Sequence, residues 1–203
     1  FQEPLDDKTS FRLGGPAEVF IVPRTMVDIK TILNLCSQEG LPMLILGNGT
    51  NLLVKDRGFC GVVVSLREHF NQLKFIGATN GAVRIEVGAG LGLPYLLDLS
   101  IKKGWSGLEF VAGLPGSVGG GVVMNAGLPD RTLGQLIQKI ILLSRLGEVY
   151  QLKGDSLTFS YRSSNIPPGD IVLAAEIALQ ERDKQEIKKE VHSYYQKRKT
   201  TQP

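Results

Sequence analysis

Two patterns of apolar and polar positions in residues 1–70, helical spacing and short apolar runs, predict a small α/β subdomain. Helical spacing from Thr25 to Gly40 predicts a helix, in which Thr25 and Asp28 have the spacing of a capping box and Gly40 is a natural stop. Short apolar runs predict strands, the first after a Gly-Gly-Pro turn and ending at Val22, the others at 42–46 and 61–65. The apolar face of the helix would consist of Ile29, Ile32, Leu33 and Cys36.

A second α/β subdomain is predicted over residues 71–182. The alternating segments 73–76 and 82–88 flank an Asn80-Gly81 turn and predict a hairpin. Pro94 begins a helix that Gly104 ends. Later apolar runs predict strands of an antiparallel sheet, at 137–143, 149–152 and 171–179. The charged segment 183–203 predicts a surface helix over 183–199 and a polar connector toward a further domain.

The stretch from Gly113 to Gly127 contains six glycines among apolar residues. Glycine loses the most backbone entropy on ordering, so the stretch is a weak helix and a weak strand. Apolar neighbours such as Val118 and Val122 indicate that it is buried. Two interpretations remain open, a large flat ligand lying on the main chain or a tightly packed loop without a ligand.

A second glycine-containing segment, Gly47-Asn-Gly-Thr-Asn51, follows a predicted buried strand. Its consecutive N–H groups could form an anion-binding nest, although Asn-Gly is also a common dipeptide of plain turns. The segment is neither the dinucleotide fingerprint nor a Walker loop. Two backbone-lined segments on two subdomains could together hold a long ligand with a pyrophosphate in its middle.

Composition narrows the function classes. The net charge is only +3, from 23 basic and 20 acidic residues, which gives no sign of a nucleic-acid partner. Two cysteines and two histidines offer no metal-ligand spacing, and we expect two reduced, packed thiols in a cytoplasmic protein. No apolar run approaches the length of a membrane span, so we expect no membrane partner.

Five motifs stand in order along the chain, and a sixth segment ends it. The motifs are Phe11-Arg-Leu-Gly-Gly-Pro-Ala17, Leu46-Gly-Asn-Gly-Thr-Asn-Leu-Leu-Val54, Gly107-Leu-Glu-Phe-Val-Ala-Gly-Leu-Pro-Gly-Ser-Val-Gly-Gly120, Met124-Asn-Ala-Gly127 and Phe159-Ser-Tyr-Arg162, with the terminal Arg198-Lys-Thr-Thr-Gln-Pro203. Together they resemble the UDP-N-acetylenolpyruvoylglucosamine reductase family over essentially the whole sequence. That resemblance implies an α+β fold, the two-subdomain FAD-binding module of the vanillyl-alcohol-oxidase (PCMH) type.

The resemblance also implies the chemistry. The enzymes of this family bind FAD noncovalently, take a hydride from NADPH and reduce UDP-N-acetylglucosamine enolpyruvate to UDP-N-acetylmuramate for peptidoglycan synthesis; we expect a monomer. The cofactor would contact two sets of residues and the later strand. The first set, at the pyrophosphate, is Gly47, Asn48, Gly49, Thr50, Asn51 and Leu52; the second, near the isoalloxazine, is Gly113, Pro115, Gly116, Ser117, Gly119, Gly120, Asn125 and Gly127, and the strand residue is Ile171.

Arg162 matches the family's catalytic arginine. Hydride transfer to C3 of the enolpyruvyl group develops negative charge on C2 and the carboxylate, and a fixed guanidinium stabilises that charge. The alternative is an ordinary surface arginine. Tyr161 and Lys199 are the expected substrate-binding residues, and Arg198 is a second candidate; the alternative for these last two is a solvated basic helix end.

The chain departs from the family pattern in two places. A third domain, which supplies the proton donor to C2, follows the Thr-Gln-Pro segment in the family, so we expect this chain to supply the FAD-binding part and to turn over poorly alone. Leu128-Pro129-Asp130 replaces the family's usual Ala-Tyr-Gly. Two other functions remain open, a stand-alone FAD-binding module and another oxidoreductase of the same FAD superfamily.

Overall fold

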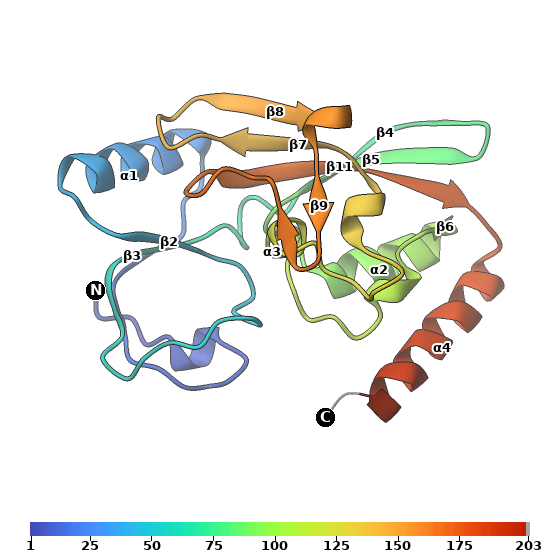
Figure 1. The fold of residues 1–203 in the computed structure, drawn as a ribbon, viewed down its shortest axis with the longest axis horizontal. Helices are drawn as coiled ribbons and strands as arrows, with labels where there is room; N and C mark the ends of the chain where they lie inside the picture. The colour runs from blue at the N-terminus through green and yellow to red at the C-terminus, as the bar shows by residue number, and fades with distance from the viewer. Residues whose placement is uncertain (202–203) are drawn as a thin grey trace.

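The computed structural model describes residues 1–201, so Gln202 and Pro203 of the terminal motif lie outside the described residues. A three-stranded parallel sheet occupies the first part of the chain, with β3 (Phe59–Ser65) between β1 (Ala17–Ile21) and β2 (Met43–Leu46). Helix α1 (Met26–Gln38) connects the two outer strands, on the left of Figure 1.

The predicted helix α1 is confirmed together with its cap. The Asp28 N–H donates to Thr25 Oγ1 at 3.2 Å, and the Thr25 N–H donates to Asp28 Oδ2 at 2.8 Å. These two bonds satisfy N–H groups that have no partner inside the helix. Its buried face has the four predicted residues Ile29, Ile32, Leu33 and Cys36.

A larger antiparallel sheet follows. Its strand order is β4-β5-β11-β7-β8, with β6 (Trp105–Ser106) paired to the far end of β11. The predicted hairpin turn is present, because Asn80 and Gly81 have φ of 49° and 79°. The bounds of the main strands are β4 (Leu73–Thr79), β5 (Ala82–Gly88), β7 (Ile137–Leu143), β8 (Val149–Lys153) and β11 (Ile171–Glu181).

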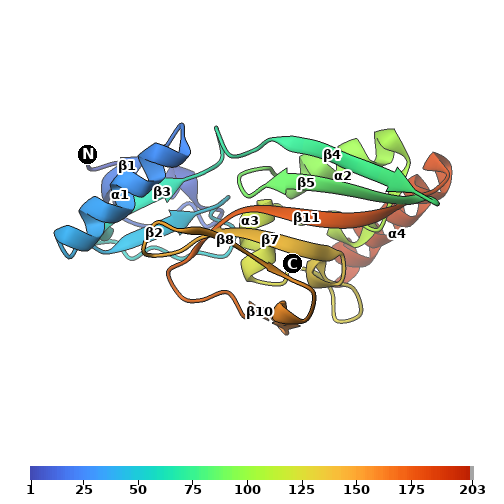
Figure 2. The ribbon, with the colours of Figure 1, turned by 90° about the horizontal axis from the view of Figure 1, so that it is seen from above.

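Helices α2 (Leu93–Lys103) and α3 (Val118–Val123) lie along one side of this sheet (Figures 1 and 2). Buried side chains of α1 and β3 belong to the same apolar cluster as those of β5, β7 and β11, so the core is continuous between the two sheets. The predicted boundary at residue 70 falls between β3 and β4. Short elements complete the chain: η1 (Asp6–Lys8), η2 (Glu109–Val111), η3 (Leu133–Gln135), η4 (Gly154–Ser156), β9 (Phe159–Ser160) and β10 (Ser163–Ser164).

Three expectations need correction. The glycine stretch contains a helix, α3, because its glycines allow close packing: a Cβ on Gly119 would lie 2.8 Å from Ala89 Cβ. Helix α4 (Lys184–Thr201) is not only a surface helix, because Ile187 and Val191 are buried in the core. Cys60 is exposed and free, not packed.

Within residues 1–201, no helix has both the length and the apolar character of a membrane span. The same residues contain no group of histidine, cysteine, aspartate and glutamate side chains placed to hold a metal ion.

Candidate FAD site

The two glycine-containing segments lie in direct contact. Asn48 Nδ2 donates to the carbonyl oxygen of Pro115 at 2.9 Å, although the residues are 67 positions apart. A Cβ on Gly47 would come within 2.5 Å of Ser117 Oγ, so only glycine allows this approach without a shift. The first segment follows β2, and the second follows η2 and continues into α3. The fold therefore joins the two segments into one site.

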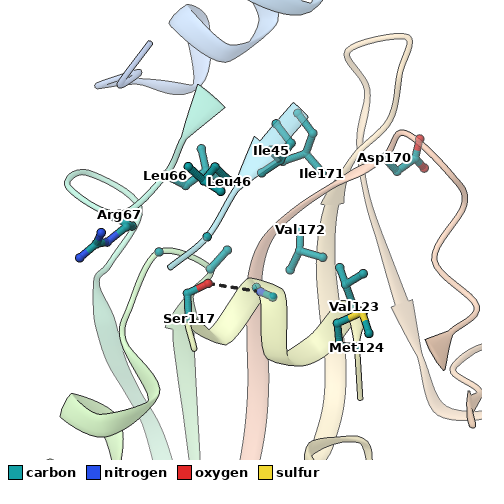
Figure 3. Close-up of a pocket in the computed structure, with 15 residues that line it drawn as sticks. Ile45, Leu46, Leu66, Arg67, Ser117, Val123, Met124, Asp170, Ile171 and Val172 are labelled. Atoms are coloured by element: carbon teal, nitrogen blue, oxygen red, sulfur yellow. Dashed lines mark hydrogen bonds between the residues drawn. The ribbon is translucent and has the colours of Figure 1, made fainter. Parts of the chain in front are cut away.

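The second segment is held from behind by the chain that connects β5 to α2. The N–H of Leu93 donates to the Gly116 carbonyl at 2.9 Å, and those of Val118 and Gly119 donate to the Leu91 and Ala89 carbonyls at 2.8 Å. Ser117 is 2% exposed, and its Oγ accepts from the Gly120 N–H at 3.4 Å, the bond drawn in Figure 3. These contacts fix the backbone that faces the first segment.

An apolar cavity of about 160 Å³ lies between the two segments and the start of β11 (Figure 3). One ordered water needs only about 10–15 Å³, so this cavity has room for part of an organic ligand. Arg67 and Asp170 lie at opposite ends of the view. The apolar lining comes from Ile45, Leu46, Leu66, Val123, Met124, Ile171 and Val172, and the side-chain-poor lining from Gly47, Gly90, Gly119 and Gly120.

A second, polar cavity of about 380 Å³ lies beside the first and shares Arg67 and Gly90 with it. Asn48, Asn71 and Tyr95 contribute to its lining. Sequence reasoning missed Arg67 because one arginine after a strand carries no recognisable pattern. The two cavities together offer apolar and polar surface to an elongated ligand.

The first segment has the donors that a phosphate group needs. Within residues 1–201, the backbone N–H groups of Asn48, Gly49, Thr50 and Asn51 donate no hydrogen bond to the protein. Gly49 has a φ of 63°, the left-handed conformation that forms backbone nests. Asn48 lines the polar cavity, and Gly47 lines the apolar one. Unsatisfied N–H groups beside the polar cavity suit a pyrophosphate, and the glycine-lined wall of the apolar cavity suits a flat ring, so the residues present fit FAD.

Ile171 is the first residue of β11, is 1% exposed and lines the apolar cavity. The predicted contact of its main chain with the flavin nucleotide stays a prediction. Its neighbour Asp170 was not expected at the site. Asp170 Oδ2 accepts from the Tyr150 hydroxyl at 2.5 Å and Asp170 Oδ1 from the Arg145 N–H at 3.1 Å, so the carboxylate is held from two sides.

The Tyr150 phenol is expected to ionise unusually late. Burial, followed by the hydrogen bond to Asp170, raises the pKa of Tyr150 to about 12, against about 10 for a free tyrosine. Since the pKa rises on folding, the protonated phenol contributes stability that is complete below about pH 10 and is lost as the pH approaches 12. An alkaline titration of tyrosinate absorbance should show one phenol ionising near 12. That step should vanish in Tyr150→Phe; its persistence would contradict the assignment.

Arg162 also meets the first segment. It lies on the turn between β9 and β10 with a φ of 53°, and Arg162 Nη2 donates to Asn51 Oδ1 at 2.9 Å. Tyr161, beside it, is 87% exposed. Two residues 111 positions apart are thus joined, and the predicted catalytic arginine lies against the predicted pyrophosphate loop.

Four other predicted residues differ in their surroundings. The Asn125 carboxamide does not line either cavity and instead bonds to the main chain of Ser160 and Gly134. Gly127 packs against Arg131, where a Cβ would lie 2.2 Å from the carbonyl oxygen. Lys199 is exposed on α4, whereas Arg198 is buried and donates to the Phe110 carbonyl at 3.2 Å.

Burial lowers the pKa of Arg198 from its ordinary value. The side chain packs against Gly113, where a Cβ would lie 3.1 Å from Arg198 Cδ. Arg198 therefore supports the start of the glycine stretch instead of extending into solvent.

The segment Leu128-Pro129-Asp130, which departs from the family pattern, forms a tight turn. The turn is closed by the Leu128 N–H, which donates to the Arg131 carbonyl at 2.7 Å.

This fold and site define an FAD-binding protein of the PCMH type, as predicted. Residues 17–152 match the FAD binding domain family. Two cholesterol oxidase structures, one from Brevibacterium sterolicum, share the fold at TM-scores of 0.61 and 0.64 and identities of 14% and 11%, which shows the architecture alone.

More similar proteins define the family. The structure of UDP-N-acetylenolpyruvylglucosamine reductase (MurB) from Thermus caldophilus matches the whole chain at a TM-score of 0.85 and 33% identity, covering 70% of that protein. The reductases of Syntrophus aciditrophicus and Clostridium novyi are 38% and 39% identical over 100% and 98% of this chain. The chain belongs to the UDP-N-acetylenolpyruvoylglucosamine reductase family. It spans 65% and 63% of the length of these two relatives.

Proposed function

We propose that this chain binds FAD noncovalently and serves the reduction of UDP-N-acetylglucosamine enolpyruvate by NADPH. The observation that carries the proposal is the contact among three predicted elements: Asn48 bonds to Pro115 of the glycine stretch, Arg162 bonds to Asn51, and glycines of both segments line one cavity. The proposal includes a monomer that works in the cytoplasm.

Bound FAD would supply two-electron transfer, taking a hydride from NADPH and giving it to C3 of the enolpyruvyl group. Gly47 to Leu52 would hold the cofactor through main-chain N–H groups, and Gly113 to Gly120 would form a close-packed wall that excludes water from it. Ile171 would add a main-chain contact, as would Gly127. Cofactor binding of this kind needs no side-chain chemistry from the chain, which accounts for the glycine-lined walls of the cavity.

Arg162 would stabilise the charge that the substrate develops. The hydride adds to C3, and negative charge then spreads over C2 and the carboxylate until C2 takes a proton. A guanidinium stays charged at any relevant pH and is already ordered by Asn51, so it favours the charged state over the neutral substrate. We assign the donation of this proton to the part of the longer relatives that this chain does not match. Tyr161 and Lys199 are assigned to substrate contacts.

Binding of FAD to the purified chain tests this proposal. Saturation should quench flavin fluorescence, and FAD at a hundred times its dissociation constant should raise the free energy of unfolding by about 2.7 kcal/mol. FMN, which lacks the adenylate half, should bind more weakly. A chain that is folded by circular dichroism but neither quenches FAD nor gains stability from it would refute the proposal.

A further inference from the structure

The turn that carries Arg162 has little secondary structure of its own. Strands β9 and β10 have two residues each and pair only with each other. A two-stranded hairpin is marginally stable even at greater length. Arg162 also has a φ of 53°, a conformation that costs energy outside glycine. Contacts from outside the hairpin must therefore hold the turn in place.

Both arms of the hairpin are bonded to the end of α3. Asn125 Nδ2 donates to the Ser160 carbonyl at 2.9 Å, and Ser164 Oγ donates to the Val123 carbonyl at 3.1 Å. Asn125 is 8% exposed, and its Oδ1 accepts from the Gly134 N–H at 3.0 Å. One buried carboxamide thus connects α3, η3 and the strand that leads into Arg162.

The surroundings of Asn125 are built for this contact. Asn125 has a φ of 43°, and asparagine tolerates the left-handed conformation better than most residues. A Cβ on Gly134 would lie 2.5 Å from the ring of Phe159 and 2.8 Å from Asn125 Oδ1, so a larger residue there would displace both. Both polar atoms of the carboxamide have protein partners, and one of these partners, Ser160, belongs to the hairpin.

We propose that Asn125 is a positioning residue for Arg162: it holds the β9–β10 turn in the position from which the guanidinium reaches Asn51. This inference rests on the proposed catalytic role of Arg162. It assigns to Asn125 a function that the resemblance did not, since Asn125 entered as a cofactor contact.

Asn125→Asp isolates the tether. Aspartate has the same shape and also tolerates the left-handed conformation, and its carboxylate still accepts from Gly134. It cannot donate to Ser160 and instead sets an oxygen against the Ser160 carbonyl. Asn80→Asp is the matched control: Asn80 has a φ of 49° in the β4–β5 turn, and no described residue bonds to its side chain.

The first measurement uses backbone NMR relaxation of the chain. Order parameters of Tyr161 and Arg162 should be near the rigid value of about 0.85 in the wild type and in Asn80→Asp, and below about 0.6 in Asn125→Asp. Ser164→Ala, which removes the other arm's bond, should lower them less. If Asn125→Asp does not fold, Asn125→Gly replaces it, because glycine also adopts the left-handed conformation and removes the same donor; unchanged order there would contradict the tether.

The second measurement uses turnover by the intact polypeptide encoded by the gene that contains this chain. Asn125→Asp should slow kcat about tenfold, and should add nothing further in the Arg162→Ala background, because it acts through that residue. An equal loss in both backgrounds would refute the inference. A severe Arg162→Ala with an inert Asn125→Asp refutes the inference alone, whereas an inert Arg162→Ala refutes the proposed function as well.

Discussion

Arg162→Ala is expected to slow turnover of UDP-N-acetylglucosamine enolpyruvate by about 10²–10³-fold, the usual effect of removing one preorganised donor that faces developing charge. The loss should fall on the step in which substrate takes the hydride. Stopped-flow absorbance of the flavin should therefore show slow reoxidation by substrate and an unchanged rate of reduction by NADPH. The intact polypeptide is the material for this measurement.

The size of the effect follows from how Arg162 is held. Its guanidinium is bonded to Asn51 at 2.9 Å and its turn is tied to α3, so the charge is in place before substrate arrives. Arg162→Lys keeps the charge but loses the planar fork that can bind a carboxylate and Asn51 together, so it should recover only part of the rate. Arg57→Ala, at an exposed turn, is the control. Equal rates of both half-reactions in Arg162→Ala and wild type would show that the role assigned to Arg162 is wrong.

Gly47→Ala is expected to weaken FAD binding by roughly 5- to 150-fold, the equivalent of the 1–3 kcal/mol that overpacking usually costs. Gly47 does not have a positive φ, so the new methyl group does not meet the strain of a left-handed conformation. Its Cβ would lie 2.5 Å from Ser117 Oγ, which is buried and caps α3. Ser117 Oγ must then shift, which either breaks its cap bond to Gly120 or moves the two loops apart, and either change alters the cavity wall.

Fluorescence titration with FAD measures this loss, and two variants isolate its cause. Gly77→Ala, in β4, has no atom within 4 Å of its Cβ and should bind FAD as the wild type does. Ser117→Ala removes the oxygen that Gly47→Ala would meet. Alone, Ser117→Ala loses the cap of α3, which costs about 1 kcal/mol in the free energy of unfolding. In the Gly47→Ala background, Ser117→Ala should therefore lower the FAD affinity less than it does in the wild type. Additive losses would show that contact between the loops is not the cause.

Sequence reasoning recovered the regular elements because their apolar periods are strong. The capped helix α1, the Asn80-Gly81 hairpin and the long strand β11 all have local signals that no distant contact overrides. Helix α3 was missed because propensity counts only the cost of ordering glycine. Its stability comes from close packing on Ala89 and Leu133, which are neighbours in space and not in sequence.

The candidate site divides in the same way. The two glycine-containing segments could be found separately, and the resemblance identified Arg162. The bond from Arg162 to Asn51 and that from Asn48 to Pro115 join residues 111 and 67 positions apart, and no periodicity reports such pairs. The burial of Arg198 and the tether by Asn125 were likewise invisible, because each depends on which carbonyl groups the fold brings near.

The position of β11 also has a consequence for biosynthesis. This strand is the last of its sheet in the chain, yet it lies between β5 and β7, and both depend on it for half of their pairing. On the ribosome, the hairpin β4–β5 and the pair β7–β8 emerge first and must wait with open edges. The sheet, and the cavity wall that Ile171 provides, can close only after translation has passed residue 181.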